Sequence, residues 1–179
     1  MTGVLGESFD TVLDAARAGE GWAFERLFDA FGRPVAAYLR GAGVEDPDGA
    51  ANEVFLRAFR GLGAFVGDED RFRSWIFTIA HHLLIDERRR RARRATSVPL
   101  DGTPEPVATD DLAIALGDDR VRRLLAGLAP DQRDVVLLRI VADLSLEDTA
   151  QALGKKVNAV KALQHRAMRA LRNRLDEEA

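Results

Sequence analysis

Residues 128–174 constrain the fold of this chain more than any other segment. Ser145 is a preferred N-cap residue, and Asp148 three positions later completes a pair typical of a capping box. Gly154 can end a helix in the left-handed conformation without a steric penalty. The segment therefore predicts a short helix, a turn and a second helix from about Val157, which together form a helix-turn-helix. The first helix is expected to be amphipathic, and four residues at helical spacing form the stripe that packs inward: Leu146, Thr149, Ala150 and Leu153.

The second helix of this motif has an apolar face and a basic face. No carboxylate occurs between Lys155 and Leu175, and such a run of cations suits a phosphate backbone. A solvated basic helix near the end of the chain, where cations complement the helix dipole, is the alternative. The residues expected to pack inward are Val160, Leu163, Ala167 and Leu171. The candidates for contact with duplex DNA are Lys155, Lys156, Asn158, Lys161, Ala162, His165 and Arg166.

The composition excludes several classes of protein. Of the 179 residues 46% are apolar, which is too many for a disordered polymer. The absence of cysteine excludes disulfides and thiolate metal sites. No signal peptide is evident, and no apolar run approaches the roughly 20 residues that cross a bilayer. We expect a cytoplasmic protein without membrane insertion.

The net charge of −3 hides two basic segments. Residues 71–100 carry a net charge of +6 and residues 120–179 carry +4. The acidic residues 101–119, with a net charge of −6, lie between them. Two separated basic segments predict two contacts with nucleic acid on one chain.

Helical periodicity runs through the rest of the chain, and no alternating strand pattern competes with it. The predicted fold is all-α, with two small helical domains joined by a flexible acidic linker and a helix-turn-helix in the second domain. Four prolines and glycines break the helical pattern in the linker: Pro99, Gly102, Pro104 and Pro106. The predicted boundaries are residues 1–94 for the first domain, 95–117 for the linker and 118–179 for the second domain.

No motif for catalysis or for a metal site is present. His81 and His82 are adjacent on a helix and diverge by about 100°, so they cannot converge on one ion. The chain has no glycine-rich phosphate loop, nucleophile elbow or zinc-protease motif, and its acids fit ordinary helix-surface patterns. We therefore expect neither an enzyme nor a cofactor.

The order of these segments resembles that of the extracytoplasmic-function (ECF) sigma factors of bacteria. The first domain carries Asn52-Glu53-Val54-Phe55-Leu56-Arg57-Ala58-Phe59 and Phe72-Arg73-Ser74-Trp75-Ile76-Phe77-Thr78-Ile79-Ala80, followed by Asp86 and a run of arginines. The second carries Leu128-Ala129-Pro130-Asp131-Gln132-Arg133, then Leu144-Ser145-Leu146-Glu147, Ala159-Val160-Lys161 and His165-Arg166-Ala167. The resemblance covers nearly the whole chain.

The resemblance implies a transcription initiation factor that binds core RNA polymerase and directs it to promoters. It implies contacts with the clamp of the β′ subunit and the flap of the β subunit, and an anti-sigma factor as a further partner. The first domain would open the −10 element, and the second would read the −35 element as duplex through the seven candidates above. The linker would thread through polymerase toward the RNA exit path, although a plain spacer is the alternative.

Residues of the first domain acquire roles from the same resemblance. Asn52 and Glu53 match the helix that meets the polymerase clamp, although an exposed acid on a helix is more often only solvated. Phe65 and the Gly67–Asp70 loop match the loop that captures an unstacked base, with core packing of Phe65 as an equal alternative. Trp75 shares a face with apolar residues, which favours core packing. The candidates for −10 DNA are Phe65, Arg73, His82, Arg88 and Arg89.

Two other functions fit part of the pattern. A DNA-binding regulator could use the second domain without joining polymerase, with the first domain serving for dimerisation or ligand sensing. An all-helical interaction module could present its basic stripe to an acidic protein. Complex formation with core polymerase and salt-sensitive binding to promoter DNA distinguish these functions from a sigma factor.

Overall fold

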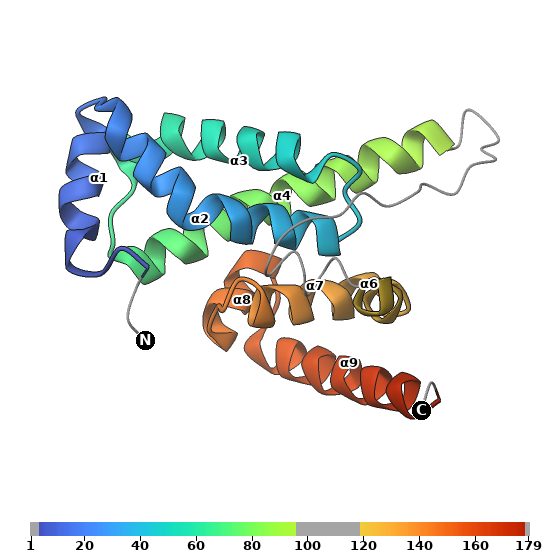
Figure 1. Ribbon diagram of the computed structural model, residues 1–179. Helices are drawn as coiled ribbons and strands as arrows, with labels where there is room; N and C mark the ends of the chain where they lie inside the picture. The colour runs from blue at the N-terminus through green and yellow to red at the C-terminus, as the bar shows by residue number, and fades with distance from the viewer. Residues whose placement is uncertain (1–3, 96–118, 178–179) are drawn as a thin grey trace.

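The computed structural model describes residues 4–95 and 119–177, and every regular element in these ranges is helical (Figure 1). The all-α prediction is confirmed. Most of the predicted linker lies outside the described residues. The first part of the chain forms α1 (Phe9–Arg17), α2 (Gly21–Gly41), α3 (Pro47–Gly61) and α4 (Glu69–Ala95), with short 3-10 turns at Gly6–Ser8 and Leu62–Ala64. The second forms α6 (Asp119–Ala126), α7 (Pro130–Ile140), α8 (Leu146–Leu153) and α9 (Val157–Glu177).

Side-chain caps fix the starts of several helices. Asp46 accepts a hydrogen bond of 2.9 Å from the backbone N–H of Gly49, and Pro47 follows it at the first position of α3. Asp68 accepts one of 2.9 Å from the N–H of Arg71, and α4 begins at Glu69, inside the Gly67–Asp70 segment expected to be a loop. These caps satisfy amide groups that the helices themselves leave without partners.

The predicted helix-turn-helix is present in α8 and α9. The Ser145 hydroxyl oxygen accepts a hydrogen bond of 2.9 Å from the N–H of Asp148, and the hydroxyl donates one of 2.6 Å to the Asp148 carboxylate. Gly154 ends α8 with φ of 61°, in the left-handed region. Val160 and Ala167 are buried and Leu163 and Leu171 half-buried, which confirms the apolar face predicted for α9.

Aromatic rings fill the centre of the first domain. Phe72 of α4 is fully buried and lies 5.7 Å from the ring of Phe9, 5.2 Å from Phe31 and 5.5 Å from Phe65. One continuous apolar cluster includes these rings and also buried leucines of α7, among them Leu137. The two domains therefore share a core, and a smaller cluster of Val135, Ala150 and Val160 holds the helix-turn-helix together.

Two acids depart from the expected helix-surface pattern. Glu69 is buried, and its carboxylate accepts hydrogen bonds of 2.9–3.1 Å from the backbone N–H groups of Leu5 and Gly6. Asp134 is buried between the two domains. The expectation was wrong for both residues because their partners lie far away in the sequence. No helix within residues 4–95 and 119–177 has the length and apolar content needed to cross a membrane.

The left-handed end of α8 provides a stability prediction. A Cβ on Gly154 would meet no neighbouring atom, so Gly154→Ala tests backbone strain alone. We expect it to lower the free energy of unfolding by about 1–2 kcal/mol, measured by urea denaturation. Gly63→Ala is the control because its φ is ordinary and its surroundings are equally open. Equal effects of the two substitutions would contradict this account of the turn.

Candidate nucleic-acid and polymerase interfaces

The α9 surface presents the predicted −35 residues to solvent. Six of the seven are exposed: Lys156, Asn158, Lys161, Ala162, His165 and Arg166. Lys155 differs, because it is half-buried and its ammonium group lies 2.8 Å from the carboxylate of Asp131 in α7. The exposed residues share one helix and its preceding turn, which is the arrangement that a reading helix needs.

The predicted −10 residues occupy α4 and the loop before it, in different environments. His82 and Arg89 are exposed, and the guanidinium of Arg89 lies 4.0 Å from the carboxylate of Asp86. Arg73 is half-buried, with its guanidinium 5.3 Å from the centre of the Phe31 ring. Arg88 bonds to the second domain through Asp134. The structure thus leaves His82 and Arg89 exposed to solvent and gives Arg73 and Arg88 other contacts.

Phe65 is part of the aromatic core in this structure. Its ring is buried and stacks on Trp75 with centres 5.0 Å apart. The next residue, Val66, is 83% exposed and precedes Gly67, so it is the apolar side chain that this loop presents to solvent. A role of Phe65 in DNA contact stays a prediction, and it would require the ring to leave Trp75. Trp75 itself is half-buried in the same cluster.

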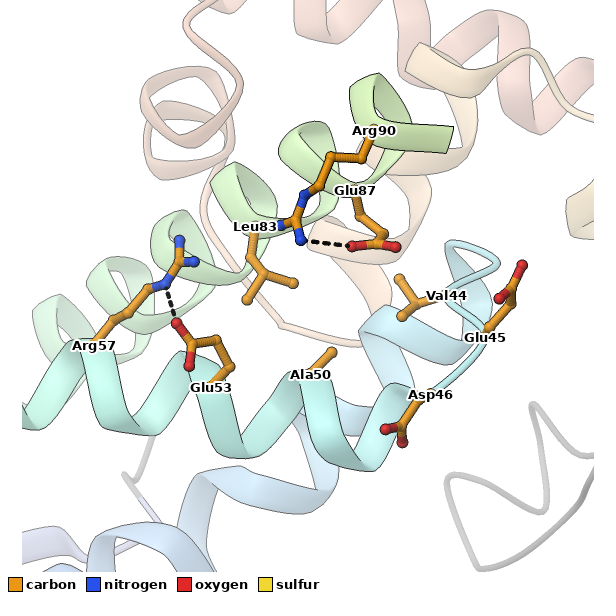
Figure 2. A pocket seen from close by; sticks show the side chains of 9 residues that line it. All are labelled: Val44, Glu45, Asp46, Ala50, Glu53, Arg57, Leu83, Glu87 and Arg90. Carbon is orange, nitrogen blue, oxygen red and sulfur yellow. Dashed lines mark hydrogen bonds and ion pairs between the residues drawn. The ribbon is translucent and has the colours of Figure 1, made fainter. Parts of the chain in front are cut away.

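A cavity of about 350 Å³ lies between α3 and α4 and contains the predicted polymerase contact Glu53 (Figure 2). Glu53 and Arg57 form an ion pair of 2.7 Å, and this hydrogen bond holds the pKa of the Glu53 carboxyl below its usual value. Arg90 and Glu87 form a second pair of 3.6 Å on the α4 side. Carboxylates outnumber guanidinium groups around the cavity, because Glu45 and Asp46 line its far end. Such a surface favours a basic partner.

The outer surface of α3 adds an apolar contact that sequence reasoning missed. Asn52 and Leu56 lie one turn apart, and Leu56 is 50% exposed. The signal was present in the sequence, since Leu56 falls off the otherwise regular stripe of Ala51, Val54, Phe55, Ala58, Phe59 and Leu62. An exposed leucine beside Glu53 is the combination of apolar anchor and charge common at protein interfaces.

Comparison with known proteins identifies the two domains. Residues 27–94 match the family model of sigma-70 region 2, and residues 118–171 match that of sigma-70 region 4. The chain is 31% identical over 181 residues to the ECF RNA polymerase sigma factor SigD of Mycobacterium tuberculosis, covering 95% of this chain and 85% of SigD. This chain belongs to the ECF sigma factors. They are transcription initiation factors that direct promoter-specific transcription.

Other relatives agree with this assignment. The ECF sigma factor is 35% identical over 178 residues to BldN of Streptomyces coelicolor, covering 94% of this chain but 66% of BldN, so it spans slightly less than two thirds of that relative. CnrH, solved in complex with the cytosolic domain of CnrY, has a TM-score of 0.69 at 28% identity over 97% of this chain and 100% of that chain. RpoE of Bartonella quintana, solved with the anti-sigma factor NepR, has a TM-score of 0.71 over 86% of this chain and 96% of that chain, and at 19% identity it shows the fold alone.

His81 gives this ECF sigma factor a testable pH response. Its imidazole is buried beneath the second domain and shares a hydrogen bond of 2.9 Å with the buried Tyr38 hydroxyl. Burial lowers the pKa of His81 from 6.5, against an opposing attraction by Asp134. Burial likewise raises the pKa of Tyr38, which stays protonated at neutral pH.

Because the unfolded chain binds the His81 proton more tightly, the free energy of unfolding should fall as the pH drops through about 6.5. His81→Asn keeps a hydrogen-bonding side chain but cannot titrate, so the wild-type protein should lose up to about 1.4 kcal/mol per pH unit more than the variant. Urea denaturation between pH 7.5 and 5.5 measures this. The neighbouring charged groups Arg88, Asp131 and Asp134 are present in both proteins. Parallel stability curves would exclude His81 as the titrating group.

Proposed function

We propose that this chain binds core RNA polymerase and directs it to promoters with two elements, its first domain opening the −10 element and its second reading the −35 element. The exposed basic face of α9, which carries no carboxylate between Val157 and Leu175, is the observation that carries the proposal. Polymerase supplies the chemistry and this chain supplies the promoter address, so we propose no catalytic activity for it. The same role implies that it acts in the cytoplasm, where polymerase and DNA are found.

The two domains fit different parts of this task. Region 4 offers a reading helix whose cations Lys161 and Arg166 are exposed and available for phosphates. Region 2 offers the acidic cavity at Glu53 and the exposed Leu56 for the polymerase clamp. Arg73, His82, Arg88 and Arg89 then place cationic and hydrogen-bonding groups along α4 for −10 DNA. An anti-sigma factor is a further proposed partner, because CnrH was solved in complex with the cytosolic domain of CnrY and RpoE with the anti-sigma factor NepR.

Substitution of two α9 cations tests the −35 assignment. We expect Lys161→Ala with Arg166→Ala to weaken binding to duplex promoter DNA about tenfold or more and to reduce the salt slope by about two, because two phosphate contacts are lost. Fluorescence anisotropy across a salt series measures both quantities. Arg26→Ala with Arg33→Ala removes two exposed cations of α2 and should change neither. Loss of core polymerase binding in the α9 variant, with DNA affinity intact, would reverse the assignment.

Charge reversal at Glu53 tests the polymerase assignment. Glu53→Arg should weaken association with core polymerase about tenfold or more, because it would set a positive charge against the basic partner that the acidic cavity favours. Asp10→Arg on the exposed face of α1 makes the same charge change away from the cavity and should have little effect. Affinity is measured by titrating labelled protein with core enzyme, after unfolding midpoints confirm that both variants fold. Unchanged affinity for Glu53→Arg would remove the cavity from the interface.

A further inference from the structure

The two domains of this chain are packed against one another through the helix proposed to meet −10 DNA. Helix α4 lies against α8, and α2 approaches α7 (Figure 1). The shared apolar cluster continues across this boundary. Region 4 therefore covers part of α4.

Polar contacts between described residues also join the domains at this boundary. The Nη1 and Nη2 atoms of Arg88 donate hydrogen bonds of 2.6 and 2.8 Å to the two carboxylate oxygens of Asp134. The Asp134 side chain is 2% exposed and that of Arg88 is 29% exposed. At the other end of the contact, the Ser74 hydroxyl donates a bond of 3.2 Å to Asp148, the residue that also caps α8 with Ser145. We call the Arg88–Asp134 pair the interdomain clasp.

The clasp occupies the hydrogen-bond donors of Arg88 that would otherwise be available to a DNA phosphate. A carboxylate and a phosphate both accept paired hydrogen bonds from a guanidinium, so Asp134 and a promoter phosphate compete for the same donors of Arg88. A cavity of about 510 Å³ beside the clasp is lined by His82 and Arg89 from the proposed −10 surface. Gly154 and Lys155 from the turn of the helix-turn-helix line it too. Groups proposed for two different promoter elements thus border one cavity.

The packing of the two domains around one cavity does not allow both promoter elements to be bound at once, because these elements lie far apart on the DNA. Elements centred at −10 and −35 are about 25 base pairs apart, which is about 85 Å of duplex at 3.4 Å per base pair. One cavity cannot contact both elements at once. The segment between Ala95 and Asp119 is long enough, at about 3.5 Å per residue, to allow the domains to separate by most of that distance.

We propose that the structure is a closed form of the chain in which Asp134 of region 4 substitutes for a promoter phosphate at Arg88, so that the clasp must open before −10 DNA can bind. The proposal rests on the promoter-binding function proposed above. In this proposal Asp134 has a regulatory role, because Asp134 lowers the affinity of the free chain for DNA. A partner that separates the domains would remove this competition.

The state of the clasp is measured by energy transfer between dyes on the two domains. The chain has no cysteine, so cysteines at the exposed positions Asp70 of α4 and Glu147 of α8 can carry a donor and an acceptor dye in the full chain. We expect efficient transfer in the labelled parent and lower transfer after Asp134→Asn. Asp143→Asn is the matched control, because it removes one exposed acid of the same domain and should leave transfer unchanged. Arg88→Gln is the second variant, because it leaves Asp134 in place but unpaired, which also favours opening.

Binding to a labelled 12-nucleotide oligothymidine measures the competition itself. Asp134→Asn should bind this probe about tenfold more tightly than Asp143→Asn, the gain expected when one charged hydrogen-bonding partner of Arg88 is removed. Because both variants change the net charge equally, a general electrostatic effect cancels. Circular dichroism checks folding, and if Asp134→Asn unfolds, the transfer efficiency of Arg88→Gln decides the matter.

Each outcome supports or overturns the proposal. Unchanged transfer in the folded variants would show that the clasp does not hold the domains together. Lower transfer in Asp134→Asn without tighter binding than Asp143→Asn would show that Asp134 does not compete with phosphate. Failure of the chain to support promoter-specific transcription, with both expected effects present, would overturn the proposed function and leave the clasp intact.

Discussion

A buried carboxylate needs a cation, and among the described residues the ion pair of Asp134 is formed with Arg88 of the other domain. Leaving such a group unpaired costs about 3–5 kcal/mol, whereas the pair itself adds little beyond neutralising that cost. The pair therefore fixes the relative placement of the domains more than it stabilises either one. It also sets the environment of His81 and Tyr38, which lie beneath the second domain near Asp134. The position of α4 against α8 follows from this requirement and from the shared apolar cluster.

Helix α4 consequently packs in the core of the first domain and also contacts the second domain. Its apolar face completes the aromatic core around Phe72, and its polar face carries Arg88 and His82 toward the second domain. The proposed function requires that polar face to be exposed to −10 DNA. Arg88 cannot pair with Asp134 and with a promoter phosphate at the same time, so the contact that stabilises the closed form weakens promoter binding. A modest free-energy difference between the closed and open forms would then control how much of the chain can bind DNA.

The parts of the fold that depend on local chemistry were predictable from the sequence. Ser145 and Gly154 bound α8 through contacts within a few residues, and the apolar face of α9 follows from spacing alone. Two features depend on packing between different segments of the chain and could not be read in this way. Phe65 stacks on Trp75, and Asp134 pairs with a residue 46 positions earlier. Single-segment periodicity places an acid such as Asp134 on a surface without showing that another domain covers that surface.

Transcription in vitro on fragmented genomic DNA tests the central claim most directly. Core RNA polymerase is assayed with and without the protein, and the 5′ ends of the RNA products are mapped. A promoter-directing sigma factor predicts new 5′ ends at discrete sites that share two spaced upstream elements. No new start sites at low salt, with folded protein and a core enzyme shown to be active with another sigma factor, would contradict the account.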